Sequence, residues 1–302
     1  MNWIIKSRNN FEMHGHAIQR HVFSKQTQYQ QVEVVDTFNY GRVLILDGIP
    51  QSSSADEFIY HEAIVHPTLC AHPDPREILI IGGGEGAVLR EVLKYTTVQQ
   101  VTMVDIDREL VDICREYLSD WHQGAFDNSK VQILYEDGRG YLQANANRFD
   151  CIILDLSDPF DGSPATKLFT LEFYELARCA LRETGLLALQ AECGALHHSD
   201  EHYRIVHTLR QVFPSVLPYY LHIPIYATLY AFAICGGSAL TSEQLTSPQI
   251  DLILESRSVH DLRFYDSETS RGLFALPKYI RQMLENADNQ TITDSSPLEM
   301  QI

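Results

Sequence analysis

The chain has 302 residues, of which 45% are hydrophobic and 21% charged, a composition typical of one large or two smaller globular domains. Its 23 basic and 40 acidic residues give a net charge of −17, which argues against nucleic acid as a partner, because a phosphate backbone requires a basic face. An acidic protein attracts cations and so suits a cationic small-molecule substrate, although many proteins are acidic merely for solubility.

The sequence also bears on where the chain acts. No apolar run is long enough to span a bilayer, and the N-terminus lacks the basic and apolar segments of a signal peptide. The six cysteines are scattered, and none forms a CxxC pair. We therefore expect a cytoplasmic protein with reduced thiols and no membrane partner.

Residues 1–72 predict a small N-terminal β domain. Residues 31–36 and 42–48 have the composition of strands, and the Asn and Gly between them suit a hairpin turn. Residues 56–71 have the apolar spacing of a helix, which the following prolines end. We expect the domain boundary at this stop.

From Arg76 onwards, strand and helix patterns alternate. We expect helices over 87–95 and 109–118, and strands over 78–81, 101–105, 131–135, 151–155 and 186–190. Such alternation is typical of a Rossmann-like α/β fold, in which helices cover both faces of a parallel sheet. We assign residues 73–287 to this catalytic domain, and the polar residues 288–302 to a disordered tail.

A glycine-rich turn follows the first strand of this domain, in the sequence ILIIGGGEGA. Gly82 and Gly84 would let the backbone turn tightly and approach a ligand closely. Glu85 lies inside the turn, where it would repel a phosphate or the carboxylate of an amino-acid cofactor. The turn therefore favours a ligand with an ammonium group, unless Glu85 simply faces solvent.

Further acidic residues follow the next strands. Asp105 lies where a carboxylate can accept hydrogen bonds from ribose hydroxyls, or can cap the following helix. Asp137 could accept from the amino group of an adenine, or be a turn residue. Because the carboxyl ends of parallel strands meet at one edge of the sheet, these acids indicate an adenosine ligand.

The fourth strand ends in the sequence DLSDP, which brings Asp155 and Asp158 close together. These carboxylates could hold a cationic amine and take its proton, or cap a helix and a turn. A metal site is not indicated, because no histidine lies at ligand spacing. Cys193 has no identifiable base beside it, which favours a buried structural thiol over a nucleophile.

With these residues in place, the chain resembles the polyamine aminopropyltransferases, the spermidine and spermine synthase family. The resemblance runs from about Gln31 to Arg281 and rests on the motifs VLILDGIPQSSSADEFIYHEAIVHP, ILIIGGGEGAVLREVLKY, MVDID, EDGRGYL, FDCIILDLSDP and HIPIY. It implies a homodimer or homotetramer. It also implies transfer of an aminopropyl group to an amine from decarboxylated S-adenosylmethionine, a co-substrate and not a bound cofactor, with release of methylthioadenosine.

The resemblance also implies roles for individual residues. The donor would be bound by Gln51, Gly82, Gly84, Glu85, Asp105, Asp137 and Gly138, with Asp155 also facing its amine. The acceptor would be bound by Tyr60, His61, Asp155, Asp158, Glu192 and Tyr226, where His61 replaces a glutamine of many members. Asp155 would take the acceptor's proton, aided by Tyr60 and Tyr226, and no metal is implied.

The sequence leaves the acceptor open among putrescine, agmatine and spermidine. Glu192 resembles the spermidine synthase pattern and favours putrescine, whereas Glu85 in place of an aspartate and the sequence DWHQGAFDN resemble the agmatine, triamine or thermospermine branch. The main alternative function is an N-methyltransferase that uses intact S-adenosylmethionine, because the fold is shared. Glu85 argues against it by repelling the cofactor's carboxylate. A catalytically silent polyamine-binding protein is a third hypothesis.

Overall fold

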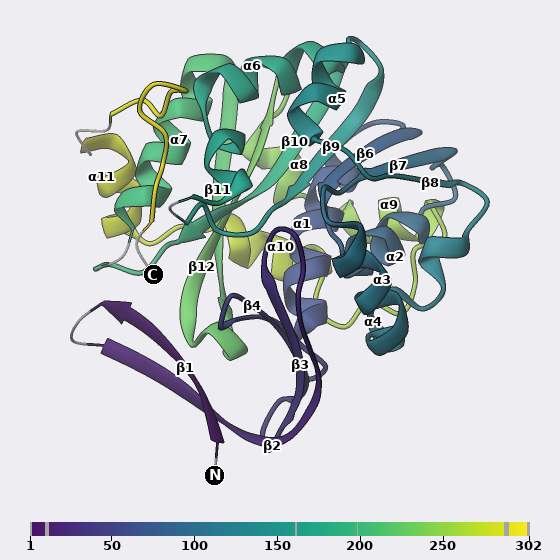
Figure 1. Cartoon of the computed structure of the whole chain (residues 1–302). Helices are drawn as coiled ribbons and strands as arrows, with labels where there is room; N and C mark the ends of the chain where they lie inside the picture. The colour runs from purple at the N-terminus through teal and green to yellow at the C-terminus, as the bar shows by residue number, and fades with distance from the viewer. Residues whose placement is uncertain (1, 10–11, 161, 198, 287–289, 301–302) are drawn as a thin grey trace.

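The structure of the chain is a computed structural model that describes residues 2–9, 12–160, 162–197, 199–286 and 290–300. It contains a small N-terminal sheet and a larger sheet covered by helices (Figure 1). A helix, α1 (Glu57–Ala71), follows the small sheet and leads into the larger one.

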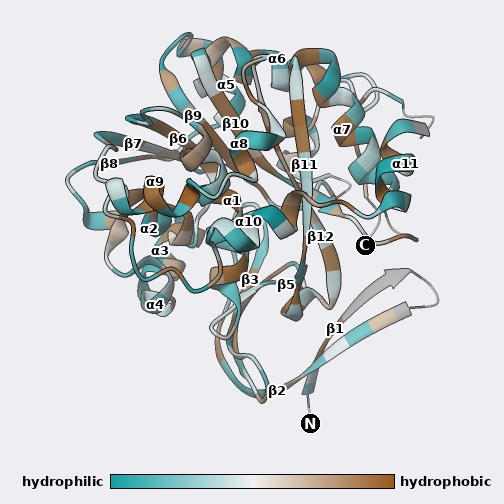
Figure 2. Cartoon of the chain, turned by 180° about the vertical axis from the view of Figure 1, so that it is seen from behind, coloured by the Kyte–Doolittle hydropathy of each residue, from teal (hydrophilic) through white to brown (hydrophobic). Residues whose placement is uncertain are grey.

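The N-terminal sheet is five-stranded and antiparallel, and its strands lie side by side in chain order. They are β1 (Asn2–Asn9), β2 (Glu12–Gln26), β3 (Gln31–Thr37), β4 (Gly41–Leu46) and β5 (Ile49–Ser53). The predicted strands correspond to β3 and β4, which confirms the small N-terminal β domain. In Figures 1 and 2 the β1–β2 ribbon extends away from the rest of the molecule.

The larger sheet has seven strands in the order β11-β12-β10-β9-β6-β7-β8. They are β6 (Glu77–Gly82), β7 (Gln100–Val104), β8 (Val131–Leu134), β9 (Phe149–Asp155), β10 (Leu181–Cys193), β11 (Ser215–Ile223) and β12 (Thr228–Gly236). The five predicted strands, β6 to β10, pair in parallel, which confirms the Rossmann-like fold. Strand β12 is antiparallel to both of its neighbours, so the sheet is mixed but mainly parallel.

Helices cover both faces of the larger sheet. They are α2 (Ala87–Leu93), α3 (Arg108–Tyr117), α4 (Ser119–His122), α5 (Gly138–Ala144), α6 (Leu171–Ala180), α7 (Asp200–Val212), α8 (Ser242–Leu245), α9 (Ile250–Ser256), α10 (Ser267–Phe274) and α11 (Lys278–Asn286). Short 3₁₀ turns are η1 (Ala125–Asp127), η2 (Pro164–Leu168) and η3 (Pro224–Tyr226).

Alternation of side chains along the central strands explains the two layers. In β9, Cys151 and Ile153 pack with α1, α2, α8, α9 and α10, whereas Ile152 and Leu154 pack with α5, α6, α7 and α11. Because both faces are covered, the strand needs a continuous apolar run, and Figure 2 shows the central strands as mostly hydrophobic. This run is the signal that made the strand predictable.

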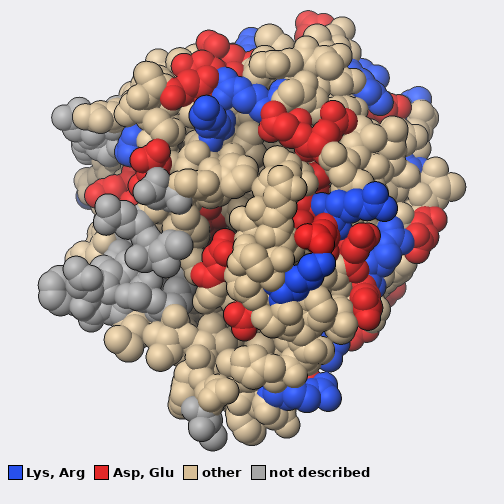
Figure 3. All heavy atoms as spheres, viewed as in Figure 1, with Lys and Arg blue, Asp and Glu red and all other residues tan. Residues whose placement is uncertain are grey.

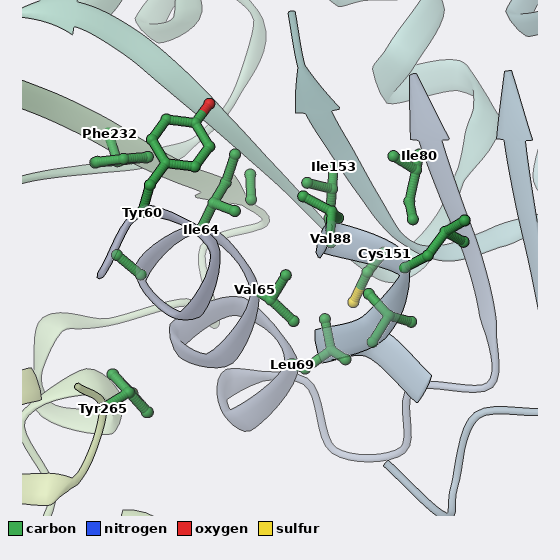
Figure 4. Packing of buried hydrophobic residues seen from close by; sticks show 14 of the residues in the cluster. Tyr60, Ile64, Val65, Leu69, Ile80, Val88, Cys151, Ile153, Phe232 and Tyr265 are labelled. Carbon is green, nitrogen blue, oxygen red and sulfur yellow. The ribbon is translucent and has the colours of Figure 1, made fainter. Parts of the chain in front are cut away.

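The domain boundary differs from the one expected at residue 72. Helix α1 belongs with the larger sheet, because it packs against α2, β9 and β10. Figure 4 shows Ile64, Val65 and Leu69 on the side of this helix that faces Ile153 and Cys151, while the hydroxyl of Tyr60 points away from the apolar cluster. The boundary therefore lies between β5 and α1. A proline stop marks the end of a helix, which need not be the edge of a domain.

The C-terminal segment also differs from the expectation of a disordered tail from residue 288. Within its described part, residues 290–300, Ile292 and Leu298 are buried in the main core. Asp294 forms an ion pair with Arg139 of α5, and the backbone N–H of Leu171 donates to the carbonyl of Ile292. Two apolar anchors in a polar sequence are enough to dock it. Residues 288–289 and 301–302 of that tail lie outside the described residues.

The two sheets are joined by a separate apolar cluster. Val32 and Leu44 of the N-terminal sheet pack against Leu110 and Ile113 of α3 and against Trp121 of α4. This contact fixes the small sheet over the end of the larger one. Within the described parts of the chain, no helix has the length and apolar character needed to cross a bilayer.

Candidate active site

A cavity of about 320 Å³ lies between the two sheets. One wall is formed by the residues that follow β6, β7, β8 and β9, at the carboxyl ends of these strands. The opposite wall comes from the N-terminal sheet, including Tyr29, Gln30 and Ile49. The carboxyl edge of an open α/β sheet is where ligands bind, and this volume suits a small molecule.

Nearly all of the predicted site residues line this cavity. They are Gln51, Tyr60, His61, Gly82, Gly84, Glu85, Asp105, Asp137, Gly138, Asp155, Asp158 and Tyr226. The sequence motifs therefore converge in one place, although they are spread over more than half of the chain.

Glu192 is the predicted site residue that does not line the cavity. It is 2% exposed, and its backbone N–H donates to the side-chain oxygen of Gln190 at 2.9 Å. Pairing of β10 with β12 is irregular between Gln190 and Cys193, and Glu192 has a φ of +66° there. Such a bulge changes the direction of the side chains that follow it. A direct contact between Glu192 and a substrate is not supported.

The glycine loop after β6 is closely packed against the end of β9. Gly82 has a φ of +81°, and a Cβ atom there would lie 2.1 Å from the carbonyl oxygen of Asp155. A Cβ atom on Gly138 would lie 2.5 Å from a methyl group of Ile81. Only glycine fits at these two positions. Because glycine has no side chain, the backbone of the loop and of the start of α5 can line the cavity directly.

Glu85 is a largely buried acid, with 15% of its side chain exposed, so it is not the solvent-facing loop residue of the alternative. Its Oε2 accepts a hydrogen bond from the Ser52 hydroxyl at 2.7 Å, and the indole N–H of Trp121 donates to the same hydroxyl at 2.9 Å. Burial raises the pKa of Glu85 to about 7, although the nearby His61 opposes this shift. Near neutral pH, a charge placed beside Glu85 would therefore change the fraction of this carboxyl group that is ionised.

His61 links Glu85 to a buried ion pair. Its Nε2 lies 3.8 Å from Glu85 Oε2, and its Nδ1 lies 2.8 Å from Glu57 Oε2. Arg90 contacts both oxygens of Glu57, at 3.1 and 2.9 Å. Burial alone would lower the pKa of His61, but the hydrogen bond and charge of Glu57, with Glu85 and Asp155 nearby, outweigh it and raise the pKa. Glu57 and Glu85 therefore stabilise the imidazolium form of His61 relative to that of an ordinary histidine.

Asp155 is paired with a tyrosine. The Tyr60 hydroxyl donates to Asp155 Oδ1 at 2.8 Å. Burial raises the pKa of Asp155, while the charge of His61 and the bond from Tyr60 partly offset the rise. Asp155 is thus a stronger base than an exposed aspartate and lies at the carboxyl end of the sheet.

A second group of polar residues lies beside this pair. The Tyr230 hydroxyl donates to Gln190 Oε1 at 2.9 Å and lies 3.3 Å from Asp158 Oδ1. The Tyr226 hydroxyl donates to the carbonyl oxygen of Gln51. Burial raises the pKa of both tyrosines well above its ordinary value, so the hydroxyls keep their protons.

The acids after β7 and β8 are also hydrogen-bonded to the protein. Asp105 Oδ1 accepts from the N–H of Asp107 at 2.8 Å, and burial raises the pKa of Asp105 to about 7. Asp137 caps α5 by accepting from the N–H groups of Arg139 and Gly140. Asp137 is therefore a helix cap, where the alternative that we considered was a turn residue, and it also lines the cavity.

Sequence reasoning missed several residues that shape this site. Ser52 and Trp121 support Glu85, Arg90 supports Glu57, and Tyr230 lines the cavity. Ser52 directly follows the predicted Gln51, which is a usable signal. The others come from distant segments and are recognisable only once the fold is known.

The electrostatic attraction of the site comes from inside the cavity. On the face shown in Figure 3, basic side chains are interspersed with acidic ones, and among the described residues of this face no continuous basic patch forms. Within the cavity, by contrast, Glu85, Asp105, Asp155 and Asp158 face a single cationic side chain among its lining residues, His61. A cation is therefore the favoured ligand.

Comparison with known families agrees with this geometry. Residues 57–244 match the family model of the spermine/spermidine synthase domain. Residues 2–53 match the model of the spermidine synthase tetramerisation domain. The two matches meet between β5 and α1, at the structural boundary.

Individual relatives match over nearly the whole chain. A polyamine aminopropyltransferase of Sulfurisphaera tokodaii is 38% identical, over 98% of this chain and 97% of its own length. Polyamine aminopropyltransferase 2 of Hyperthermus butylicus is 42% identical, over 90% of this chain and 88% of its own. The solved structure of a spermidine synthase in complex with the transition-state analogue AdoDATO matches with a TM-score of 0.85 and 27% identity, over 94% of this chain and 95% of that one.

The charge on His61 can be tested directly. In Glu57→Gln the side chain keeps a hydrogen-bond acceptor but loses its charge, so burial should dominate and the pKa of His61 should fall below its ordinary 6.5. NMR titration of ring-labelled histidines would measure it. The exposed Glu255→Gln is the control and should leave the titration unchanged. A His61 pKa that is the same in Glu57→Gln as in the wild type would contradict this assignment.

Proposed function

The chain belongs to the spermine/spermidine synthase family and is an aminopropyltransferase, and we propose that it transfers the aminopropyl group of decarboxylated S-adenosylmethionine to putrescine. The observation that carries the proposed donor is Glu85, a largely buried carboxyl group within the glycine loop, with 15% of its side chain exposed. The donor has a primary amine and no carboxylate, so it suits this environment, whereas intact S-adenosylmethionine would bring a second negative charge next to Glu85.

The proposal gives the other donor residues their roles. Glu85 and Asp155 would accept from the donor's amine, and Asp105 from its ribose hydroxyls. Asp137 would use the remaining lone pairs of its carboxylate for the adenine amino group, beside Gly138. Gln51 would complete the site from the N-terminal sheet. Each assignment is supported by the position of the residue on the cavity wall.

The proposed chemistry begins with a proton transfer. An alkylammonium has a pKa of about 10, like lysine, and its nitrogen has no lone pair for attack until it loses a proton. Asp155 would take that proton, and Tyr60, Tyr226 and Asp158 would hold the amine. The nitrogen lone pair would then attack the carbon bonded to the sulfonium. The carbon–sulfur bond would break with its electron pair on sulfur, giving methylthioadenosine and a longer amine.

Putrescine is the proposed acceptor, but not because of Glu192, which lies outside the cavity wall. The support comes from the solved relative named spermidine synthase, since spermidine is putrescine extended by one aminopropyl group. The paired acids Asp155 and Asp158 suit a primary amine. Agmatine and spermidine are the competing acceptors.

We also propose that the protein is a homodimer or homotetramer that acts in the cytoplasm. The match of residues 2–53 to a tetramerisation domain supports self-association. The six cysteines are all unpaired, which supports a reducing compartment.

A product assay tests the function as a whole. The purified protein would be given decarboxylated or intact S-adenosylmethionine with putrescine, agmatine, cadaverine or spermidine, and kcat/KM would be compared for each pair. We expect methylthioadenosine only with the decarboxylated donor and the highest kcat/KM with putrescine. A methylated amine formed from the intact donor would instead establish the methyltransferase alternative.

The role of Glu85 predicts a pH-dependent donor affinity. The carboxyl is charged above its pKa of about 7 and neutral below it, so donor binding should weaken as the pH falls through 7. Glu85→Gln should bind the donor about 10- to 100-fold more weakly at pH 8 and lose the part of the pH dependence due to Glu85, whereas the part due to Asp105, whose pKa is also about 7, should remain. Isothermal calorimetry would measure both. Methylthioadenosine lacks the amine and is the matched control ligand, which both proteins should bind equally well.

The role of Asp155 predicts a separation of binding from turnover. Asp155→Asn keeps the shape of the side chain but removes the proton acceptor, so kcat should fall about 10²- to 10⁴-fold. Donor affinity should change much less, since Glu85 is retained. Stopped assays of methylthioadenosine and calorimetry would measure these quantities, with the exposed Asp112→Asn as a control. Turnover close to that of the wild type would remove Asp155 as the base.

A further inference from the structure

The turn η3, which carries Tyr226 into the cavity wall, is held by side chains from distant parts of the chain. The backbone N–H of Ile225 donates to Asp56 Oδ2 at 2.7 Å. The carbonyl oxygen of the same residue accepts from His16 Nε2 at 3.0 Å. Both polar backbone groups of one buried residue therefore depend on side chains 169 and 209 positions away in the sequence.

A third contact comes from the same side of the molecule. The Tyr40 hydroxyl donates to the carbonyl oxygen of Pro224 at 3.1 Å. The rings of His16 and Tyr40 meet nearly at right angles, with centroids 5.0 Å apart, and His16 is 7% exposed. The N-terminal sheet thus presents a pre-formed pair of donors to successive carbonyl groups of the turn.

The turn itself offers little internal support. One hydrogen bond closes it, from the N–H of Ala227 to the carbonyl oxygen of Pro224 at 3.0 Å. Ala227 adopts the left-handed conformation, with a φ of +49°, which costs a non-glycine residue about 1 kcal/mol. A strained turn keeps its position only where the surroundings fix it. The contacts from His16, Tyr40 and Asp56 therefore set the position of the turn, and the bond from the Tyr226 hydroxyl to the Gln51 carbonyl oxygen fixes the end of its side chain.

We propose that His16 is a positioning residue for the acceptor side of the active site, which acts through the turn at Ile225. The inference rests on the proposed function, in which Tyr226 holds the acceptor amine. His16 lies on β2 opposite Ile4 of β1, so whatever orders the β1–β2 ribbon also orders this contact. The part of the chain that matches a tetramerisation domain is thereby connected to the acceptor side of the site.

The donor side has separate supports. The N–H of Gly83 donates to the carbonyl oxygen of Asp155 at 3.0 Å, and Glu85 is held by Ser52. These bonds connect β6 with β9 and β5, and do not involve η3. Of the proposed donor residues, Gln51 is bonded to η3, because its backbone carbonyl oxygen accepts from the Tyr226 hydroxyl. Loss of the His16 contact should therefore affect the acceptor much more than the donor.

Two substitutions at His16 test the proposal in the full-length protein. His16→Leu fills the space but donates no hydrogen bond, and the KM for putrescine should rise about tenfold, because a buried carbonyl loses its partner. The KM for the donor and the affinity for methylthioadenosine should stay within about twofold. His16→Gln can place its amide N–H near the position of Nε2, and should restore most of the acceptor KM. His21→Leu, an exposed histidine on the same strand, should behave as the wild type.

Hydrogen exchange provides a readout that does not depend on turnover. Mass spectrometry should show faster exchange of the Ile225 amide in His16→Leu than in the wild type, with recovery in His16→Gln. Tyr40→Phe removes only the hydroxyl that bonds Pro224, so it should fold even if His16→Leu does not, and should raise the acceptor KM in the same direction.

The outcomes separate this inference from the proposed function. A wild-type protein that transfers no aminopropyl group would overturn the proposed function and the acceptor role that this inference assigns to the turn. With normal wild-type transfer, an unchanged acceptor KM in both His16→Leu and Tyr40→Phe would overturn the positioning role and leave the function intact. Equal increases in donor and acceptor KM would also overturn it, since they indicate a general structural effect.

Discussion

The site depends on the burial of several carboxyl groups around one imidazole. Glu85 and Asp155 are largely shielded from water, and this burial favours their neutral forms. The charge of His61 opposes this shift in both, and Glu57, which is itself bonded to Arg90, raises the pKa of His61. The network therefore limits the rise in the pKa of these buried acids even before a cationic substrate is bound.

The N-terminal sheet is part of the same arrangement. Ser52 and Gln51 reach the site from β5, and Gln30 and Thr27 donate to Asp107 at the start of α3. Without this sheet the carboxyl edge of the larger sheet would face water, which would weaken every electrostatic interaction in the cavity. The two domains thus form one site, in which the smaller domain supplies the enclosure.

The parts that were predictable from sequence are those with local signals. The apolar runs of β6 and β9 and the glycine loop between β6 and α2 each have a cause within a few residues of chain. The direction of Glu192 depends on a bulge, and docking of the tail depends on Ile292 meeting a core built from other segments. The role of His16 depends on a contact across 209 positions. Local patterns do not encode such pairings.

The proposed donor side of the site contains mainly carboxyl groups, whereas the proposed acceptor side also contains tyrosine hydroxyls. This difference follows from charge. Seven acidic residues already line the cavity, and a further buried carboxylate on the acceptor side would add repulsion and desolvation. Tyr60 and Tyr230 avoid this, because burial keeps both hydroxyls protonated and uncharged. Each hydroxyl donates a hydrogen bond to a protein acceptor, Tyr60 to Asp155 and Tyr230 to Gln190. The hydroxyl oxygen then has lone pairs to offer an ammonium, which only donates. Neutral tyrosines can therefore orient an acceptor amine while Asp155 keeps the charge that its deprotonation requires.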